Sequence, residues 1–335
     1  MKKKYKLTNK TMGLIKGDGS KVILYRIRAL KDFGFINKGD LGGWVESEEN
    51  LSQEGNCWIY NDAKVYNNAR VFGNVIVFDN ATISDNAIIH GNATVCNNAK
   101  VFGNAKVYGN VIVFDNAIVC DNAKVYDDAK VFGNCYVCDD ATVFGNAKVF
   151  GNATVYGNAK VYGNVNIFGN SLLSDDSNIY NNAIVKDSKV SGSSKIAENS
   201  IVENSEIDCS YISGQVYNAK IKDTIVLATT IINGYKDIVP IIDDDRKFMT
   251  IGSINYTTED GTNLTCLTAY YYDENIYYSF CIGKAHLCFK DKDELKDYLK
   301  TELIYSYETN DILCIIKSLE ELLHQRLIRE YSNDK

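Results

Sequence analysis

The sequence has little proline and histidine, no long apolar run and no excess of basic over acidic residues. One of its 335 residues is proline (Pro240) and three are histidine, whereas 23 are tyrosine. A chain with 45% hydrophobic residues and so many aromatic rings is expected to fold. The net charge of −7 excludes the broad basic surface that duplex nucleic acid requires.

Targeting signals are also missing from the pattern. The basic residues 1–6 are not followed by the apolar segment of a signal peptide, and no segment reaches the ~18 apolar residues of a membrane span. Without such a signal, the ten cysteines are expected to be reduced thiols in a cytosol. We therefore predict a cytoplasmic protein that does not bind membranes.

What the sequence has in abundance is one hexapeptide. Residues 55–186 repeat the unit [Gly/Asn/Asp]-Asn-Ala-x-Val-[Phe/Tyr] about twenty-two times (132 residues in units of six). Because side chains alternate along a strand, the small residue and the aliphatic residue two places later point inward. The Gly/Asp-Asn pair supplies a turn, since these residues tolerate positive φ. The repeat therefore predicts a solenoid of short β-strands.

The spacing of one variant hexad predicts how many hexads close a coil. The nonapeptide Gly-Asn-Val-Ile-Val-Phe-Asp-Asn-Ala occurs at residues 73–81 and again at 109–117, 36 residues later. A third hexad with valine in the small column starts at Gly163, a further 54 residues on. Both separations are multiples of 18. We therefore predict three hexads per coil and a triangular prism.

This pattern resembles the left-handed parallel β-helix of hexapeptide-repeat proteins. The residues that carry the resemblance are those of the repeat, as in Val101-Phe102-Gly103-Asn104-Ala105-Lys106. One departure is the aromatic residue after the aliphatic one, where that family usually has a small or acidic residue. The resemblance implies the fold and says little about function.

The flanking segments predict further domains. Residues 1–54 are expected to form an N-terminal β cap, with a strand at 22–28 and a segment at 41–47 that turns into the first coil. The β-helix is predicted over 55–226, regular at 55–186 and irregular at 187–226, and residues 227–247 form a linker. We expect a small C-terminal α+β domain at 248–335. Its predicted strands lie at 248–254, 264–272 and 276–289, and its helices at 293–303 and 312–323.

Three short sequence segments outside the hexads resemble segments of bacteriophage and prophage proteins of unassigned role. They are Leu-Tyr-Arg-Ile-Arg-Ala-Leu at 24–30, Gly-Asp-Leu-Gly-Gly-Trp-Val-Glu-Ser-Glu at 39–48, and Ile-Gly-Ser-Ile-Asn-Tyr at 251–256. The resemblance implies a phage-encoded protein that acts inside the bacterial host cell. It implies no settled activity.

The outward columns of the predicted prism define three faces. The Phe/Ile face, an apolar stripe that a monomer seldom leaves in water, is predicted to form a homo-oligomer, with a trimer favoured; it contains Trp58, Tyr60, Ile76, Phe78, Ile112, Phe114, Phe132 and Phe150. The Tyr/Lys face is predicted to bind a partner or an anionic, base-stacking ligand; it contains Tyr108, Tyr126, Tyr162, Tyr180, Arg70, Lys106, Lys124, Lys160 and His90. The mixed face contains Tyr66, Ser84, Phe102, Cys120, Cys138, Tyr156 and Ser174. A simpler explanation is that stacked aromatic rings stabilise neighbouring coils.

Candidate catalytic residues are few. Acyltransferases that resemble this fold use a histidine base near a loop or subunit seam, but no loop interrupts the hexads here. His90 lies in an aromatic column and can be a substitute for an aromatic ring. His286 and His324 have no serine, cysteine or aspartate pattern beside them. We therefore predict no catalytic residue.

No metal site or cofactor is predicted either. In Cys135-Tyr136-Val137-Cys138 the hexad register sends the first thiol inward and the second outward, so the two cannot share a metal or a disulfide. Acidic pairs at 127–128, 139–140 and 175–176 lie at corners, where Ca²⁺ would require the Gly-Gly-x-Gly-x-Asp pattern. That pattern is absent, and turn formation explains these aspartates equally well.

The sequence therefore predicts a non-catalytic, oligomeric β-helix that binds or scaffolds. A phage protein of this kind could act against host defence by sequestering a host protein or a nucleotide signal. Two alternatives remain open. One is an acyltransferase that acts at a subunit seam with His90 as base. The other is a purely structural rod.

Overall fold

The computed structural model describes residues 3–16, 19–212, 214–217, 220–222, 225–226, 231–233, 250–251, 256–257, 263–272, 275–282 and 285–289. Within these residues the protein is mainly β, and the helical element is a single 3-10 turn, η1 (Glu48–Asn50). None of the described segments forms a helix with the length and hydropathy to cross a bilayer. The chain divides into two compact units, residues 1–187 and 188–335, which are described separately.

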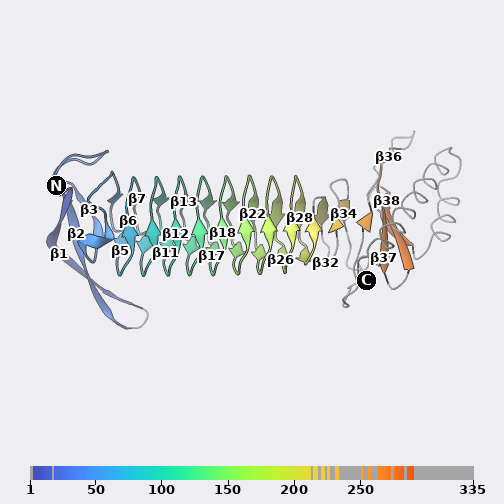
Figure 1. The fold of residues 1–335 in the computed structure, drawn as a ribbon, viewed down its shortest axis with the longest axis horizontal. Coiled ribbons are helices and arrows are strands. Elements are labelled where there is room, and N and C mark those ends of the chain that lie inside the picture. Colours follow the sequence, from blue (N-terminus) through green and yellow to red (C-terminus); the bar gives the residue numbers. More distant parts are fainter. Residues whose placement is uncertain are drawn as a thin grey trace, which may run out of the picture. The chain divides into compact units, whose positions relative to one another are not determined.

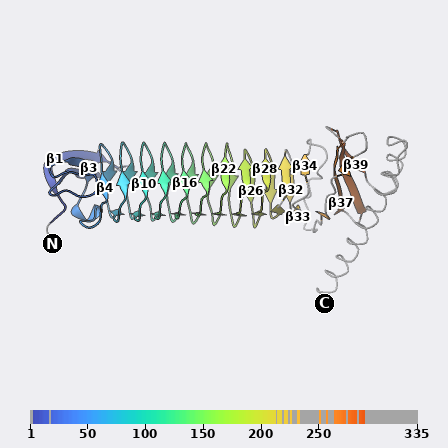
Figure 2. The same cartoon turned by 90° about the horizontal axis from the view of Figure 1, so that it is seen from above.

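The first unit is a left-handed parallel β-helix with three hexads per coil, which confirms the predicted fold. Paired residues are 18 apart, as in Thr94 with Ile112 and Val95 with Val113. The coils stack along the long axis in Figures 1 and 2.

Each side of the prism is a parallel sheet of very short strands. The mixed face is formed by β5 (Lys64–Val65), β8 (Thr82–Ile83), β11 (Lys100–Val101), β14 (Ile118–Val119), β17 (Tyr136–Val137), β20 (Thr154–Val155) and β23 (Leu172–Leu173). The Phe/Ile face is formed by β4 (Trp58–Ile59), β7 (Ile76–Val77), β10 (Thr94–Val95), β13 (Ile112–Val113), β16 (Lys130–Val131), β19 (Lys148–Val149), β22 (Asn166–Phe168) and β25 (Ile184–Lys186). The Tyr/Lys face is formed by β6 (Arg70–Val71), β9 (Ile88–Ile89), β12 (Lys106–Val107), β15 (Lys124–Val125), β18 (Thr142–Val143), β21 (Lys160–Val161) and β24 (Asn178–Ile179).

The interior of the prism contains the alanine and valine columns. Their side chains are fully buried throughout the regular coils. Val75, Val111 and Val165 directly precede β7, β13 and β22, so all three lie on the same side of the prism. The spacing of these valines along the sequence therefore predicted the number of hexads per coil correctly.

The corners explain why the hexad begins with Gly, Asn or Asp followed by Asn. Asp79, Asn97 and Asp115 occupy the left-handed region, each with φ near 59°. The next residue donates its side-chain amide to the coil beyond, with Asn80 Nδ2 lying 3.3 Å from Asn98 Oδ1. The first position thus forms the turn, and the second forms a ladder of amides that joins the coils.

An antiparallel cap covers the N-terminal edge of the mixed face. It contains β1 (Tyr5–Ile15), β2 (Lys21–Ala29) and β3 (Leu41–Val45), and β3 pairs in parallel with β5. Gly43 permits this approach, because a Cβ atom there would lie 2.7 Å from the Ala63 carbonyl oxygen. The sequence predicted β2 but neither β1 nor β3. β1 contains Lys, Asn and Gly, and β3 contains two glycines, and these residue types are depleted in strands.

The second unit begins with shorter parallel coils. Lys189 pairs with Glu206, Lys195 with Tyr211 and Ile201 with Gln215, which are spacings of 17, 16 and 14 residues. The strands are β26 (Lys189–Ser191), β27 (Lys195–Ile196), β28 (Ile201–Glu203), β29 (Glu206–Asp208), β30 (Tyr211–Ile212), β31 (Gln215–Tyr217), β32 (Lys220–Lys222), β33 (Ile225–Val226) and β34 (Ile231–Asn233). Buried serines replace the alanine column here, and Ser200 Oγ donates to the Ala197 carbonyl oxygen at 2.5 Å.

An antiparallel sheet follows in the same unit. It contains β35 (Thr250–Ile251), β36 (Tyr256–Thr257), β37 (Asn263–Tyr272), β38 (Asn275–Ile282) and β39 (Ala285–Phe289). The segment 276–289, predicted as one strand, is two strands, β38 and β39, that pair with each other. The helices predicted at 293–303 and 312–323 lie outside the described residues, as does His324.

Candidate functional site

The Tyr/Lys face carries a continuous ladder of rings. The ring of His90 stacks between those of Phe72 and Tyr108, at centroid distances of 5.0 and 4.9 Å and interplanar angles of 8° and 4°. The stack then continues through Tyr126, Phe144, Tyr162 and Tyr180. Each ring directly follows its strand, so the coil spacing sets the ring spacing.

A column of cations runs beside this ladder. Arg70, Lys106, Lys124 and Lys160 are exposed and occupy the first position of their strands. Lys106 pairs in register with Lys124 in the neighbouring coil. Among the described residues, neither lysine forms an ion pair with a carboxylate. The face therefore offers unpaired positive charge next to flat aromatic rings.

His90 is the titratable group on this face with the chemistry of a base near neutral pH. Its side chain is half-buried, and burial lowers the pKa of the imidazole below its usual 6.5. The imidazole is consequently neutral at pH 7 and can accept a proton. Burial also raises the pKa values of the Tyr108 and Tyr126 phenols, which keeps both hydroxyls protonated as hydrogen-bond donors.

The Phe/Ile face carries a second ladder. Phe114, Phe132, Phe150 and Phe168 stack at centroid distances of 4.7 to 5.0 Å. Their rings are half-buried within the protomer, as are those of Tyr60 and Phe78 and the side chains of Ile76 and Ile112. Stacking between coils therefore hides part of the apolar area and leaves the outer edge exposed to solvent.

Trp58 was wrongly predicted to belong to this exposed stripe. Its side chain is 1% exposed, and the rings of Tyr5 and Phe33 contact it edge-on at 6.2 and 5.4 Å. The cap covers the first rung of the face. Trp58 therefore contributes to the junction between cap and solenoid and is removed from the candidate contact residues.

A buried lysine in the cap was not predicted from the sequence. Lys4 is 1% exposed, and its Nζ donates to the carbonyl oxygens of Glu54, Gly55 and Cys57 at 3.2, 3.3 and 3.1 Å. Burial lowers the pKa of this ammonium group. Beside it lies a hollow of about 680 Å³ that Lys3, Lys31 and Asp32 also line. Because Lys4 donates to three carbonyl oxygens, it fixes the turn at 54–57 and has little capacity for a ligand.

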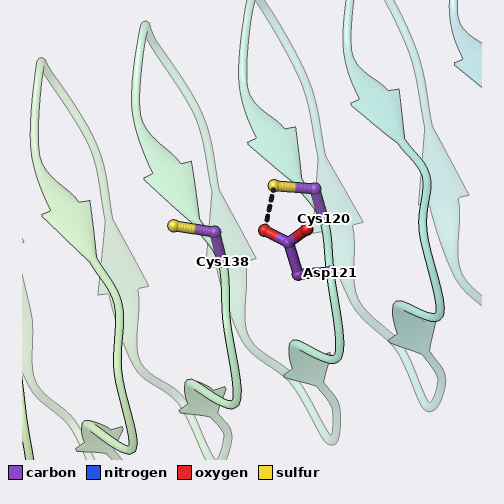
Figure 3. Close-up of side chains that lie close together, drawn as sticks. All are labelled: Cys120, Asp121 and Cys138. Carbon is purple, nitrogen blue, oxygen red and sulfur yellow. Dashed lines mark hydrogen bonds between the residues drawn. The ribbon is translucent and has the colours of Figure 1, made fainter.

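The cysteines follow the predicted register. Cys135 is fully buried in the interior, whereas Cys138 points outward and is half-buried, so the two do not meet. Cys138 instead lies beside Cys120 of the preceding coil, and Asp121 completes a group of three polar atoms (Figure 3). Both thiols were predicted on the mixed face, but their proximity to each other was not predicted.

The acidic pairs at the corners form turns, as turn formation, the explanation without a metal, predicted. Asp127 and Asp139 have φ values of 60° and 55°. Their carboxylates accept backbone N–H groups from the next coil, with Asp127 Oδ2 lying 3.3 Å from Gly145 N and Asp139 Oδ2 lying 3.1 Å from Gly157 N. These carboxylates therefore stabilise the corners.

No family model matches the chain. It is 42% identical over 62 residues to an uncharacterized acetyltransferase of Escherichia coli (strain K12), YdcK, a stretch covering 18% of this chain and 19% of that protein. Among solved structures it is similar to the UDP-N-acetylglucosamine O-acyltransferase LpxA of Moraxella catarrhalis RH4, at 14% identity over 47% of this chain and 66% of the other, with a TM-score of 0.25.

The similarity to an acetyltransferase corrects one conclusion of the sequence analysis. The chain was predicted to be non-catalytic because no loop interrupts the hexads. The 62 residues shared at 42% identity belong to a protein named as an acetyltransferase, so that prediction is wrong. The other predictions, namely a phage origin and the sequestration of a host protein or a nucleotide signal, are not addressed by this similarity and stay predictions.

Proposed function

We propose that the chain transfers an acyl group from an acyl thioester to an amine or a hydroxyl, with His90 as general base. The observation that carries this proposal is the similarity to the acetyltransferase of Escherichia coli. The geometry of His90 supports it, because a half-buried, neutral imidazole on an exposed face suits proton abstraction.

The proposed reaction balances without any further reagent. The acceptor nitrogen or oxygen attacks the thioester carbonyl carbon, and the His90 imidazole takes the proton from that nitrogen or oxygen. The tetrahedral intermediate then collapses, the C–S bond breaks, and the thiolate leaves with the proton that His90 returns. The products are an amide or ester and a free thiol. A general base of this kind contributes roughly 10²–10⁴-fold to the rate.

The rest of the Tyr/Lys face suits the donor. Acyl thioesters of coenzyme A carry phosphates and an adenine ring. Lys106 and Lys124 supply positive charge for the phosphates, and the rings of Tyr108 and Tyr126 supply flat surfaces on which a base can stack.

A direct assay tests the proposal. Full-length protein is incubated with acetyl-coenzyme A and a panel of amines and alcohols, and the released coenzyme A is quantified by chromatography, because the ten cysteines would react with a thiol dye. Acceptor-dependent release is the expected result. If no acceptor produces release and acetyl-coenzyme A does not bind in calorimetry, the proposal is wrong.

The pH dependence follows from the state of His90. Because burial lowers the imidazole pKa, the base form persists below pH 6.5. We expect kcat/KM to rise with pH through a pKa below 6.5 and to be level at neutral pH. The folded state binds this proton less readily than the unfolded state does, so stability should fall as pH drops through about 6.5. An acid limb with its midpoint above 6.5 would exclude His90 as the base.

The proposed site also requires a partner copy. The face around His90 is an open ladder and cannot exclude water from a thioester by itself. We propose that the Phe/Ile face of one protomer meets a second copy, with a trimer as the closed assembly, and that the site lies at the resulting seam. Native mass spectrometry should show three 37.4 kDa chains. Phe132→Lys should give monomers, whereas Lys130→Ala should not. A wild-type monomer would contradict this arrangement.

A further inference from the structure

Two outward thiols lie one above the other on the mixed face. Cys120 directly follows β14 and Cys138 directly follows β17. These strands pair in register, with Val119 opposite Val137, so the two cysteines occupy equivalent positions in neighbouring coils. Figure 3 shows both thiols pointing the same way.

The backbone holds this pair in place. Cys120 N donates to the Val137 carbonyl oxygen at 2.9 Å, and Cys138 N donates to the Val155 carbonyl oxygen at 3.0 Å. Each cysteine is therefore anchored to the coil that follows it. The separation of the thiols is set by the solenoid rather than by a flexible loop, so a ligand that bridges them does not have to order the chain.

A carboxylate completes the group. Cys120 Sγ lies 3.3 Å from Asp121 Oδ2, and the ligand atoms of Cys120, Cys138 and Asp121 all lie within 4.8 Å of one another. Cys120 is buried and Cys138 half-buried, whereas Asp121 is exposed. The two thiol ligand atoms are thus shielded by the protein, and the carboxylate ligand atom faces solvent.

The distances suit a tetrahedral ion. With Zn–S bonds of about 2.3 Å, tetrahedral geometry places two thiolate sulfurs about 3.8 Å apart. The ligand atoms of the three residues lie within 4.8 Å of one another, so they must move by about 1 Å or less to reach this geometry. Rotation of the side chains supplies such a movement. Soft thiolate ligands combined with one carboxylate favour Zn²⁺ over Mg²⁺ or Ca²⁺, which prefer all-oxygen sites.

We propose that Cys120, Cys138 and Asp121 form a Zn²⁺ site with an open fourth position. This site lies on the mixed face, away from the ladder that contains His90, and does not depend on acyl transfer. The exposed side of Asp121 leaves room for a water molecule or an exogenous anion as the fourth ligand.

Metal titration of the full chain tests this site. Protein reduced with a phosphine is titrated with Zn²⁺ in a calorimeter and with Co²⁺ in a spectrophotometer. Cys120→Ser and Cys138→Ser are compared with Cys96→Ser, the matched control. Cys96 occupies the same hexad position and is 7% exposed, as is Cys120, but its column neighbours are Phe78 and Phe114. We expect the wild type and Cys96→Ser to take up one more ion per chain than either of the other variants.

Two further measurements separate the possible outcomes. The thiolate-to-Co²⁺ charge-transfer band should be weaker in Cys120→Ser and Cys138→Ser, and Asp121→Asn should bind Zn²⁺ at least tenfold more weakly. Equal uptake by all variants overturns the proposal. Unchanged affinity in Asp121→Asn overturns the role given to the carboxylate. If a serine variant fails to fold by circular dichroism, Cys138→Ala replaces it in the same comparison.

Discussion

Replacing His90 by phenylalanine is expected to lower kcat/KM for acyl transfer by about 10²–10⁴-fold, while the solenoid stays folded. The change removes the proposed base and keeps the ring. Phenylalanine already occupies the same ladder at Phe72 and Phe144, where it stacks on its neighbours at 5.0 and 4.8 Å. The loss would therefore report on chemistry, because the packing between coils is preserved.

The matched control is Phe144→Tyr. It adds one hydroxyl to a ring farther along the ladder, which stacks on Tyr126 and Tyr162, and leaves the stack on His90 intact. We expect its kcat/KM to stay close to that of the wild type. Both variants are measured by chromatographic assay of coenzyme A release, and thermal unfolding midpoints verify folding. Turnover by His90→Phe at the wild-type rate would place the base elsewhere or exclude a general base on this face.

The coil period could be predicted from the sequence because it depends on local rules. Side-chain alternation assigned Ala129 and Val131 to the interior, and both are fully buried. The separations of 36 and 54 residues between the valine hexads that start at Gly73, Gly109 and Gly163 then indicated three hexads per coil, as the pairing of Thr94 with Ile112 confirms. Both steps use only the period of the sequence and require no knowledge of contacts outside the repeat.

The N-terminal cap could not be predicted in the same way. Trp58 fits the outward position of its hexad, and only the positions of Tyr5 and Phe33, more than twenty residues away, make it a core residue. Lys4 is one of three consecutive lysines, and its burial depends on three carbonyl oxygens converging at residues 54–57. Long-range contacts of this kind have no periodic signal in the sequence.

The candidate sites were in part visible. The Tyr/Lys face was assembled correctly from every third hexad, but the uninterrupted repeat was given too much weight against catalysis. The thiol pair was missed for a different reason. Only the spacing Cys-x-x-Cys was considered, whereas the spacing that brings side chains together in this fold is 18 residues, the separation of Cys120 and Cys138. In a solenoid, the coil length is the spacing at which site residues should be sought.

Val131→Asp is expected to destabilise the first unit by about 3–5 kcal/mol at pH 7. Val131 is fully buried in β16, between Val113 and Val149 of the adjoining coils. The aliphatic column offers no cation and no N–H group that donates a hydrogen bond to an aspartate there. Its charge would therefore be buried without a partner. Denaturant unfolding followed by circular dichroism measures the loss, and hydrogen exchange locates it.

The control is Lys130→Asp, one residue earlier in the same strand, where the side chain is exposed. It adds a carboxylate to the same coil and should change stability by less than about 0.5 kcal/mol.

In Val131→Asp, burial would raise the folded pKa of the introduced carboxyl above its unfolded value of about 3.9, so the folded state binds the proton more tightly. The destabilisation should therefore shrink as pH falls toward about 4 and grow as pH rises.

The amides of Phe114 and Phe132, which donate to the carbonyl oxygens of Val131 and Val149, should exchange faster in Val131→Asp only. Equal stability of the two variants would mean that the interior admits water, which would contradict a dry, close-packed prism.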